Sequence, residues 1–162
     1  KIMAKLTPTF QPIIFILSLV ACFSAAAIGS IFTADAISGW YAALQKPVFN
    51  PPNWVFGPVW TVLYMLQAVS LYTLWARKYK AKRELLTLFG VQLGLNALWS
   101  VVFFGWHSPE AALVIIITLW GLIFHIIRRS RQISKIASNL LWPYLAWVSF
   151  ATLLNVSVAL LN

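Results

Sequence analysis

Residues 10–32 read FQPIIFILSLVACFSAAAIGSIF, an apolar run without a charged side chain. A helix needs about 20 mostly apolar residues to cross the hydrocarbon core of a bilayer. Four more runs of this kind follow, at residues 54–76, 85–106, 111–127 and 140–161. The runs are long and continuous, whereas the strands of a membrane barrel are short and alternate between polar and apolar residues. The sequence therefore predicts an all-α integral membrane protein, with residues 1–162 forming a single bundle of five transmembrane helices.

The composition of the chain supports this prediction. Of its 162 residues, 61% are hydrophobic, 15% are aromatic and 9% are charged, and the mean hydropathy is +0.83. A soluble domain is typically about 45–50% apolar and about 25% charged. The composition excludes a soluble enzyme, a disordered chain and a nucleic-acid-binding domain.

The formal net charge of +9 is distributed unevenly along the chain. In a five-helix arrangement eleven of the twelve basic residues fall on one side of the membrane: Lys1, Lys5, Arg77, Lys78, Lys80, Lys82, Arg83, Arg128, Arg129, Arg131 and Lys135. Lys46 is the single exception. Basic loops stay on the cytoplasmic side, so the N-terminus is predicted to lie inside and the loop at residues 33–53 outside. Binding of anionic lipid headgroups is a possible second role for the basic side.

The first apolar run has a competing interpretation. Lys1 and Lys5 precede an apolar stretch that contains the small residues 25–27, a pattern also found in cleaved signal peptides. The run continues through Phe32, which is long for a signal peptide, so a membrane span is favoured. The single cysteine, Cys22, excludes an intrachain disulfide bond.

Tryptophan is unusually frequent, with nine residues. Four lie near span ends, where tryptophan usually anchors a helix at the membrane interface: Trp54, Trp75, Trp106 and Trp142. Four others lie several residues inside their spans: Trp60, Trp99, Trp120 and Trp147. No water reaches that depth, so each deep indole N–H needs a partner inside the protein or a ligand.

Three spans also carry polar or aromatic stripes at helical spacing. The stripes are Trp60, Tyr64 and Gln67; Gln92, Asn96 and Trp99; and Tyr144, Trp147, Ala151 and Asn155. Hydrogen bonding between helices is one explanation, favoured for Gln67 and Asn155 taken singly. Convergence of the three stripes on one aromatic small-molecule pocket is the other.

Two further features lie outside these stripes. Gly90 and Gly94 form a G-x-x-x-G pattern, which suits a dimer contact or close packing within the chain. The predicted loop at residues 33–53 is long and rich in proline and apolar residues, so it either covers the bundle as a lid or lies among lipid headgroups.

Several kinds of chemistry find no support in the sequence. The three acidic residues, Asp35, Glu84 and Glu110, lie far apart and outside the predicted spans. His107 and His125 have no spacing that indicates a haem or metal site, and no nucleotide, hydrolase or metal motif occurs. Ion-coupled transport and ordinary hydrolysis are therefore not expected.

Specific blocks of sequence resemble a known family. They read WYAALQKP at residues 40–47, NPP at 50–52, WVFGPVWTVLY at 54–64, NALWS at 96–100 and PYLAWVSFATLLN at 143–155. Together they closely resemble the TspO/MBR family, which includes tryptophan-rich sensory proteins, translocator proteins and the peripheral-type benzodiazepine receptor. The resemblance covers nearly the whole chain.

The resemblance implies a fold, ligands and site residues. The family forms five-helix bundles, usually homodimers, with a pocket closed by the first loop. The family binds protoporphyrin IX and isoquinoline or benzodiazepine-type drugs. Some bacterial members are reported to degrade porphyrin in light, in a reaction that depends on pocket tryptophans. Those tryptophans match Trp60 and Trp147 in this sequence. Tyr64, Asn96, Trp99 and Ala151 also match pocket positions, and Gly90 with Gly94 matches the dimer contact. The Tyr and Arg of the family's cholesterol motif are absent after Leu154 and Asn155, so cholesterol binding through that motif is doubtful.

These observations predict a membrane receptor or carrier for tetrapyrroles that needs no cofactor and no metal. The predicted ligand-binding residues are Trp60, Tyr64, Asn96, Trp99, Tyr144, Trp147 and Ala151. The predicted lid residues are Trp40, Lys46, Pro47, Pro51 and Pro52, with Lys46 near the ligand carboxylates. A light-dependent porphyrin-degrading enzyme and a stress-related regulatory scaffold are the alternatives. The location is a bacterial cell or outer membrane, or the mitochondrial outer membrane in a eukaryote.

Overall fold

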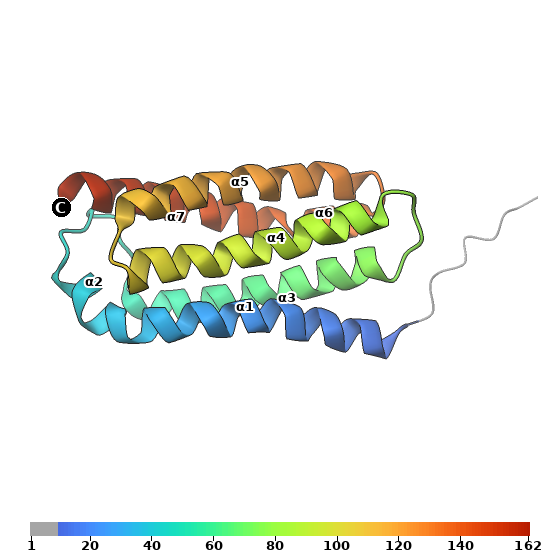
Figure 1. Cartoon of the computed structure of the whole chain (residues 1–162), viewed down its shortest axis with the longest axis horizontal. Coiled ribbons are helices and arrows are strands. Elements are labelled where there is room, and N and C mark those ends of the chain that lie inside the picture. The colour runs from blue at the N-terminus through green and yellow to red at the C-terminus, as the bar shows by residue number, and fades with distance from the viewer. Residues whose placement is uncertain (1–9) are drawn as a thin grey trace, which may run out of the picture.

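A computed structural model describes residues 10–162, so Lys1 and Lys5 lie outside the described part of the chain. The described chain is an antiparallel bundle of five long helices (Figure 1). Five helical segments are long and apolar enough to cross a membrane: Pro12–Ser38, Asn53–Trp75, Lys82–Gly105, Pro109–Arg131 and Lys135–Leu161. The predicted fold class is thereby confirmed.

The elements follow one another with short connections. They are α1 (Pro12–Ser38), α2 (Trp40–Ala43), α3 (Phe56–Trp75, after a 3₁₀ turn at Asn53–Val55), α4 (Lys82–Ser100, continued by a π-helical turn at Val101–Gly105), α5 (Pro109–Arg131), α6 (Lys135–Asn139) and α7 (Trp142–Leu161). Proline at the first helical positions starts α1, α5 and α7, because its missing N–H would be unpaired there in any case.

Several helix boundaries differ from the prediction, and the two largest extensions of a predicted span are at the C-terminal ends of α1 and α5. The helix α1 continues past Phe32 to Ser38, and α2 follows directly, so the first part of the expected loop at residues 33–53 is helical. The helix α5 continues past Ile127 to Arg131. Both extensions carry charged side chains beyond the apolar run, where hydropathy no longer marks a helix. The basic last turn of α5 also suits the negative end of its helix dipole.

The helices are arranged so that one part of the bundle stays open. α1 packs against α3 and α4, and α5 packs against α4 and α7. The helices α3 and α7 contact each other at few positions. The space bordered by α1, α3, α4 and α7 is the place where the structure leaves room for a ligand.

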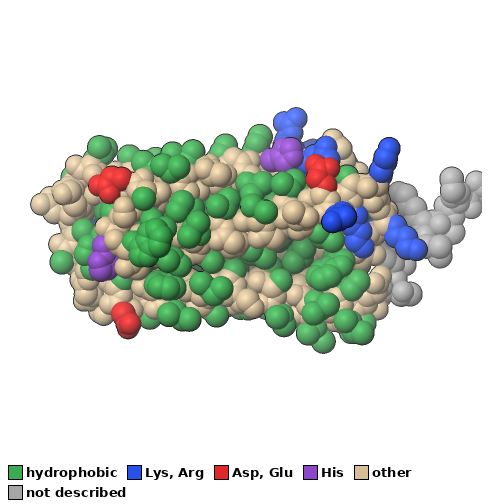
Figure 2. All heavy atoms as spheres, in the orientation of Figure 1, with side chains coloured by type: hydrophobic (Ala, Val, Ile, Leu, Met, Phe, Trp, Pro, Cys, Tyr) green, Lys and Arg blue, Asp and Glu red, His purple; other side chains and the backbone are tan. Residues whose placement is uncertain are grey.

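The charges gather at the two ends of the bundle. Figure 2 shows Lys and Arg side chains together at the end where α3 leads into α4 and α5 leads into α6. The opposite end holds Asp35, Lys46 and Glu110, which lie near the end of α1, after α2 and at the start of α5. The two ends of the described bundle therefore differ in charge, with most basic side chains at one end. The direction in which the bundle crosses the membrane stays a prediction.

A close contact between α1 and the π-helical turn yields a stability prediction. A Cβ atom built on Gly105 would lie 2.7 Å from Cδ1 of Phe32, whereas one built on Gly121 meets nothing within 4 Å. We expect Gly105→Ala to destabilise the bundle by about 1–2 kcal/mol through overpacking, seen as a melting temperature lower by several degrees. Gly121→Ala is the matched control and should be neutral or stabilising, because alanine is the better helix former. Equal melting temperatures for the two variants would contradict the prediction.

Candidate ligand-binding site

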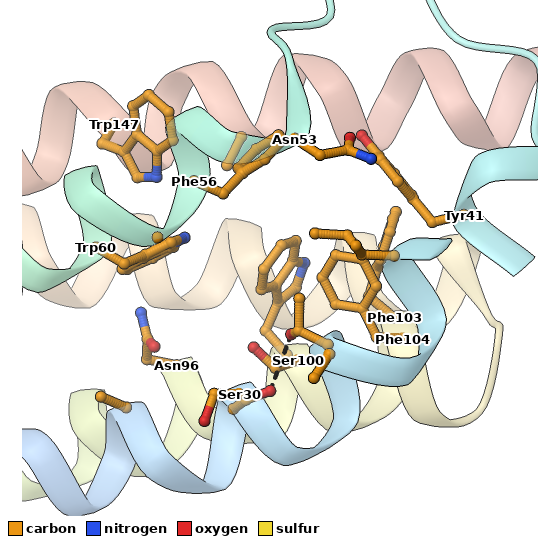
Figure 3. A pocket seen from close by; sticks show the side chains of 18 of the residues that line it. Ser30, Tyr41, Asn53, Phe56, Trp60, Asn96, Ser100, Phe103, Phe104 and Trp147 are labelled. Atoms are coloured by element: carbon orange, nitrogen blue, oxygen red, sulfur yellow. Dashed lines mark hydrogen bonds between the residues drawn. The ribbon is translucent and has the colours of Figure 1, made fainter. Parts of the chain in front are cut away.

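A cavity of about 510 Å³ lies between α1, α3, α4 and α7, beneath α2 (Figure 3). Small-molecule sites commonly occupy about 300–1,000 Å³. Nine of its lining residues are aromatic: Phe23, Tyr41, Phe56, Trp60, Tyr64, Trp99, Phe103, Phe104 and Trp147. No Lys, Arg, Asp, Glu or His is among the described residues that line it. The site suits a flat hydrophobic ligand, and its specificity must come from a few neutral polar groups.

Trp60 of α3 and Trp147 of α7 supply two of these polar groups. Neither indole N–H donates a hydrogen bond to another described residue, and Figure 3 shows both nitrogens turned into the cavity. Neighbouring aromatic rings support the two side chains, with Tyr64 at 5.6 Å from Trp60 and Phe56 at 6.1 Å from Trp147 between ring centroids. Both indoles are therefore free to donate to a ligand.

The other two deep tryptophans have partners inside the protein. Trp99 Nε1 donates to Asn155 Oδ1 at 3.0 Å, and Trp120 Nε1 donates to Ser149 Oγ at 2.8 Å. Trp120 does not line the cavity, whereas Trp99 lines it with its ring. The four deep indoles thus divide into two that stabilise the bundle and two that face empty space.

A chain of buried hydrogen bonds lies under the cavity. Tyr64 Oη donates to Asn96 Oδ1, and Asn96 Nδ2 donates to Tyr144 Oη at 2.9 Å. Tyr144 Oη donates in turn to Gln92 Oε1 at 2.9 Å, and Gln92 Nε2 donates to Gln67 Oε1 at 3.0 Å. These bonds hold the Asn96 amide in one orientation, with its nitrogen on the side of Trp60 in Figure 3. An amide nitrogen has two N–H donors, so one of them stays available to a ligand.

The helix α2 covers the cavity at the end where the loop lies. Tyr41 lines the cavity, is buried, and donates from Oη to Asn50 Oδ1 at 2.7 Å. Burial raises the pKa of the Tyr41 hydroxyl to about 12, so the group stays protonated and keeps this bond at ordinary pH. The bond ties α2 to the segment that leads into α3.

The same segment is also joined to α7. Gln45 N donates to Asn162 Oδ1 at 3.0 Å, and Asn162 Nδ2 donates to Gln45 O at 3.1 Å. The rings of Phe49 and Phe150 meet at 6.3 Å between centroids. The loop therefore packs on the bundle in the way that a lid would.

The cavity is open on the side between α1 and α3. Six of its lining residues are also exposed at the surface: Ala27, Ser30 and Ala34 of α1, Asn53 of the 3₁₀ turn, and Gly57 and Thr61 of α3. These positions belong to the membrane-spanning segments. The opening therefore faces the side of the bundle, whereas α2 closes its end.

Comparison with known proteins shows the family. Residues 17–161 match the sequence model of the TspO/MBR family. The chain belongs to the TspO/MBR family. It is 45% identical over 145 residues to the Tryptophan-rich protein TspO of Archaeoglobus fulgidus, covering 90% of this chain and 94% of that protein. It is 37% identical over 134 residues to the human Translocator protein (81% and 79% covered) and 34% identical over 149 residues to the Tryptophan-rich sensory protein of Cereibacter sphaeroides (92% and 91% covered).

The TspO/MBR chain brings most of its predicted site residues together. Six of the seven line the cavity: Trp60, Tyr64, Asn96, Trp99, Trp147 and Ala151. Tyr144 does not line it, because its ring lies fully buried beneath Asn96. Gln67 has the interhelical role favoured for it, while Asn155 both lines the cavity and bonds Trp99 and the carbonyl of Pro109.

The predicted lid residues lie outside the cavity wall. Trp40 stacks on His107 with 4.5 Å between ring centroids, and Pro47, Pro51 and Pro52 belong to the loop but do not line the cavity. The expected role of Lys46 needs correction. Its Nζ donates to the carbonyl oxygens of Tyr41, Ala42 and Leu44 at 2.7, 3.1 and 3.0 Å. All three N–H donors of the ammonium are used at the end of α2 and are not directed at a ligand.

Some lining residues escaped the sequence analysis, notably Tyr41, Phe103 and Phe104. Phe103 follows Trp99 by four residues, a helical spacing that could have extended the α4 stripe, whereas nothing local marks Tyr41. Gly90 and Gly94 lie on the outer face of α4, are exposed, and leave open space where a Cβ would be. They face away from the cavity, and their role in a TspO/MBR dimer stays a prediction.

Proposed function

We propose that this TspO/MBR protein is a membrane receptor or carrier that binds tetrapyrroles such as protoporphyrin IX, and related hydrophobic ligands, in its tryptophan-rich cavity. The observation that carries the proposal is that the indole N–H groups of Trp60 and Trp147 have no partner among the described residues and face a cavity of about 510 Å³ that is rich in aromatic side chains. A planar macrocycle stacks on such rings, and its nitrogen and carbonyl acceptors receive the N–H donors.

The polarity of the site favours one orientation of the ligand. The N–H groups of Trp60, Trp147 and Asn96 lie inside the aromatic wall, and no described cation lines it. Burying an ionised carboxylate without a charged partner is costly. The propionates of a porphyrin would therefore lie at the loop end of the opening, beside Ala34 and Asn53, where the first span ends and the second begins, and the hydrophobic ring would lie in the aromatic part of the cavity.

The direct test is a binding titration. Protoporphyrin IX added to the purified protein should quench tryptophan fluorescence in a saturable way, because two of the nine indoles line the cavity without an internal partner. An isoquinoline carboxamide, which has no carboxylate, should displace the porphyrin and restore the fluorescence. Quenching that rises without saturation, or that the competitor leaves unchanged, would contradict a shared cavity site.

The free indoles also favour a second candidate, light-dependent degradation of bound porphyrin. Trp60 and Trp147 would lie beside a pigment in the cavity, where either could transfer an electron to its excited state, with dioxygen as the terminal oxidant. Illumination of the aerobic complex should then bleach the porphyrin absorbance faster than illumination in detergent alone. Equal bleaching rates would leave binding as the whole function of the cavity.

A further inference from the structure

The basic end of the bundle has far more positive charge than its own carboxylates can neutralise. Nine Lys and Arg side chains gather there: Arg77, Lys78, Lys80, Lys82, Arg83, Arg128, Arg129, Arg131 and Lys135. Glu84 is the one carboxylate in these described segments, and it pairs with Arg129 at 3.1 Å. The remaining cations make no ion pair with any described residue. Such a surface has a strong positive potential that a polyanionic surface or an anionic headgroup would neutralise.

Three of these cations border a shallow hollow at the start of α4. Its lining consists of Lys80, Lys82 and Arg83 together with Leu86 and Thr87. Arg83, Leu86 and Thr87 share one face of α4, because they are three and four residues apart. The hollow thus combines a charged rim with a less polar wall on the same helix face.

The position of the hollow along the helix matches the depth of a lipid headgroup. The helix α3 ends at Trp75 and α4 begins at Lys82, so the rim lies where both helices leave the apolar core. Leu86 and Thr87 lie about one turn further along α4, about 6 Å deeper at 1.5 Å per residue. A phosphate at the rim would therefore place the glycerol and the start of an acyl chain against the wall. The first turn of α4 has no side-chain cap, so its N–H groups add to the positive potential.

The opposite end of the bundle lacks these properties. It holds the exposed carboxylates of Asp35 and Glu110, and the ammonium of Lys46 is bonded to three backbone carbonyls. Attraction for anionic headgroups is therefore restricted to one leaflet.

We propose that the hollow formed by Lys80, Lys82, Arg83, Leu86 and Thr87 is a binding site for an anionic phospholipid. The phosphate and a second anionic or hydroxyl-bearing headgroup lie on the three cations, and the start of an acyl chain lies against Leu86 and Thr87. This site is separate from the tetrapyrrole cavity and does not depend on the function proposed for it. Each cation near an anionic headgroup contributes about 1 kcal/mol, so three of them amount to a preference of about 100-fold.

The test compares two variants with the same change of charge. The site variant is Lys80→Gln/Lys82→Gln/Arg83→Gln, and the control variant is Lys78→Gln/Arg131→Gln/Lys135→Gln at the same end of the bundle. Detergent-solubilised protein is titrated with phosphatidylglycerol and with phosphatidylcholine, and bound lipid is counted by native mass spectrometry. We expect the unmodified protein to prefer phosphatidylglycerol, the site variant to lose at least tenfold in affinity, and the control variant to change by less than threefold.

Three outcomes would overturn the proposal. Equal losses in both variants would show that diffuse charge, and not the hollow, attracts the lipid. Displacement of phosphatidylglycerol by millimolar inorganic phosphate would show that a free anion occupies the hollow. Equal affinity for the two lipids would show that no anionic preference exists. Thermal unfolding in detergent checks that both variants are folded, since their substitutions are on the surface and remote from the cavity.

Discussion

Replacing both Trp60 and Trp147 by phenylalanine is expected to weaken protoporphyrin IX binding by about 30- to 150-fold. Phenylalanine keeps an aromatic ring for stacking but removes the N–H that each indole directs into the cavity. Each lost hydrogen bond to a ligand in a dry site contributes about 1–1.5 kcal/mol, and about 1.4 kcal/mol corresponds to a factor of ten. A fluorescence or absorbance titration with the porphyrin measures the change directly. If bound porphyrin is degraded in light, the double variant should also lose that activity.

A matched control for this experiment is Trp120→Phe. Trp120 is equally deep in its span, but its indole N–H bonds Ser149 and its side chain does not line the cavity. Its substitution should leave porphyrin affinity within about twofold, because no ligand contact is removed. Unchanged affinity in the double variant would place the ligand elsewhere. Similar losses in the double variant and the control would point to a general loss of structure.

Replacing Gln92 by leucine is expected to destabilise the bundle by about 2–6 kcal/mol without touching the cavity wall. Gln92 is buried, accepts from Tyr144 Oη and donates to Gln67 Oε1. The substitution leaves a hydroxyl donor and an amide oxygen unpaired in the apolar interior, and each such orphan costs about 1–3 kcal/mol. Hydrogen bonds between membrane helices average about 0.6 kcal/mol, so an effect confined to the bonds themselves would be much smaller. Thermal unfolding in detergent distinguishes the two magnitudes.

The double variant Gln67→Leu/Gln92→Leu provides the second half of this test. Gln67 Nε2 is buried and already has no hydrogen-bond partner among the described residues. Removing both amides therefore eliminates the orphaned groups of Gln67, leaving Tyr144 as the single residue with a lost partner. We expect the double variant to be more stable than Gln92→Leu alone. A double variant that is less stable than either single variant would contradict the assignment of the loss to unpaired polar groups.

Much of the fold could be predicted from sequence because transmembrane helices depend on local composition. Runs of apolar residues identified all five spans, and the structure agrees. The boundaries were less certain wherever a helix left the membrane. The helix α1 continues through Asp35 to Ser38, and α5 continues through its arginines, because backbone hydrogen bonding persists after hydrophobicity ends.

The site was predictable only in part. Helical spacing placed Trp60 with Tyr64, and Asn96 with Trp99, on shared helix faces, and all four residues line one cavity, while their binding of a ligand stays a prediction. Spacing along one helix does not say where a cavity ends. Tyr144 lies one turn from Trp147 but is fully buried and does not line the cavity. Lys46 was assigned to a ligand because of its charge, but the carbonyl oxygens that bind it are positioned by the fold of α2.

The sequence by itself determined that the chain crosses a membrane five times, that its basic residues collect on one side, and that four tryptophans lie deep in the spans. Only the tertiary structure decided which of those four are available to a ligand. Trp99 and Trp120 are bonded to Asn155 and Ser149, residues 56 and 29 positions away in the chain. Such partners are set by how helices rotate and pack against one another. The hydropathy of a segment follows from its own residues, whereas the availability of an indole N–H depends on which side chains of other helices lie within hydrogen-bond distance.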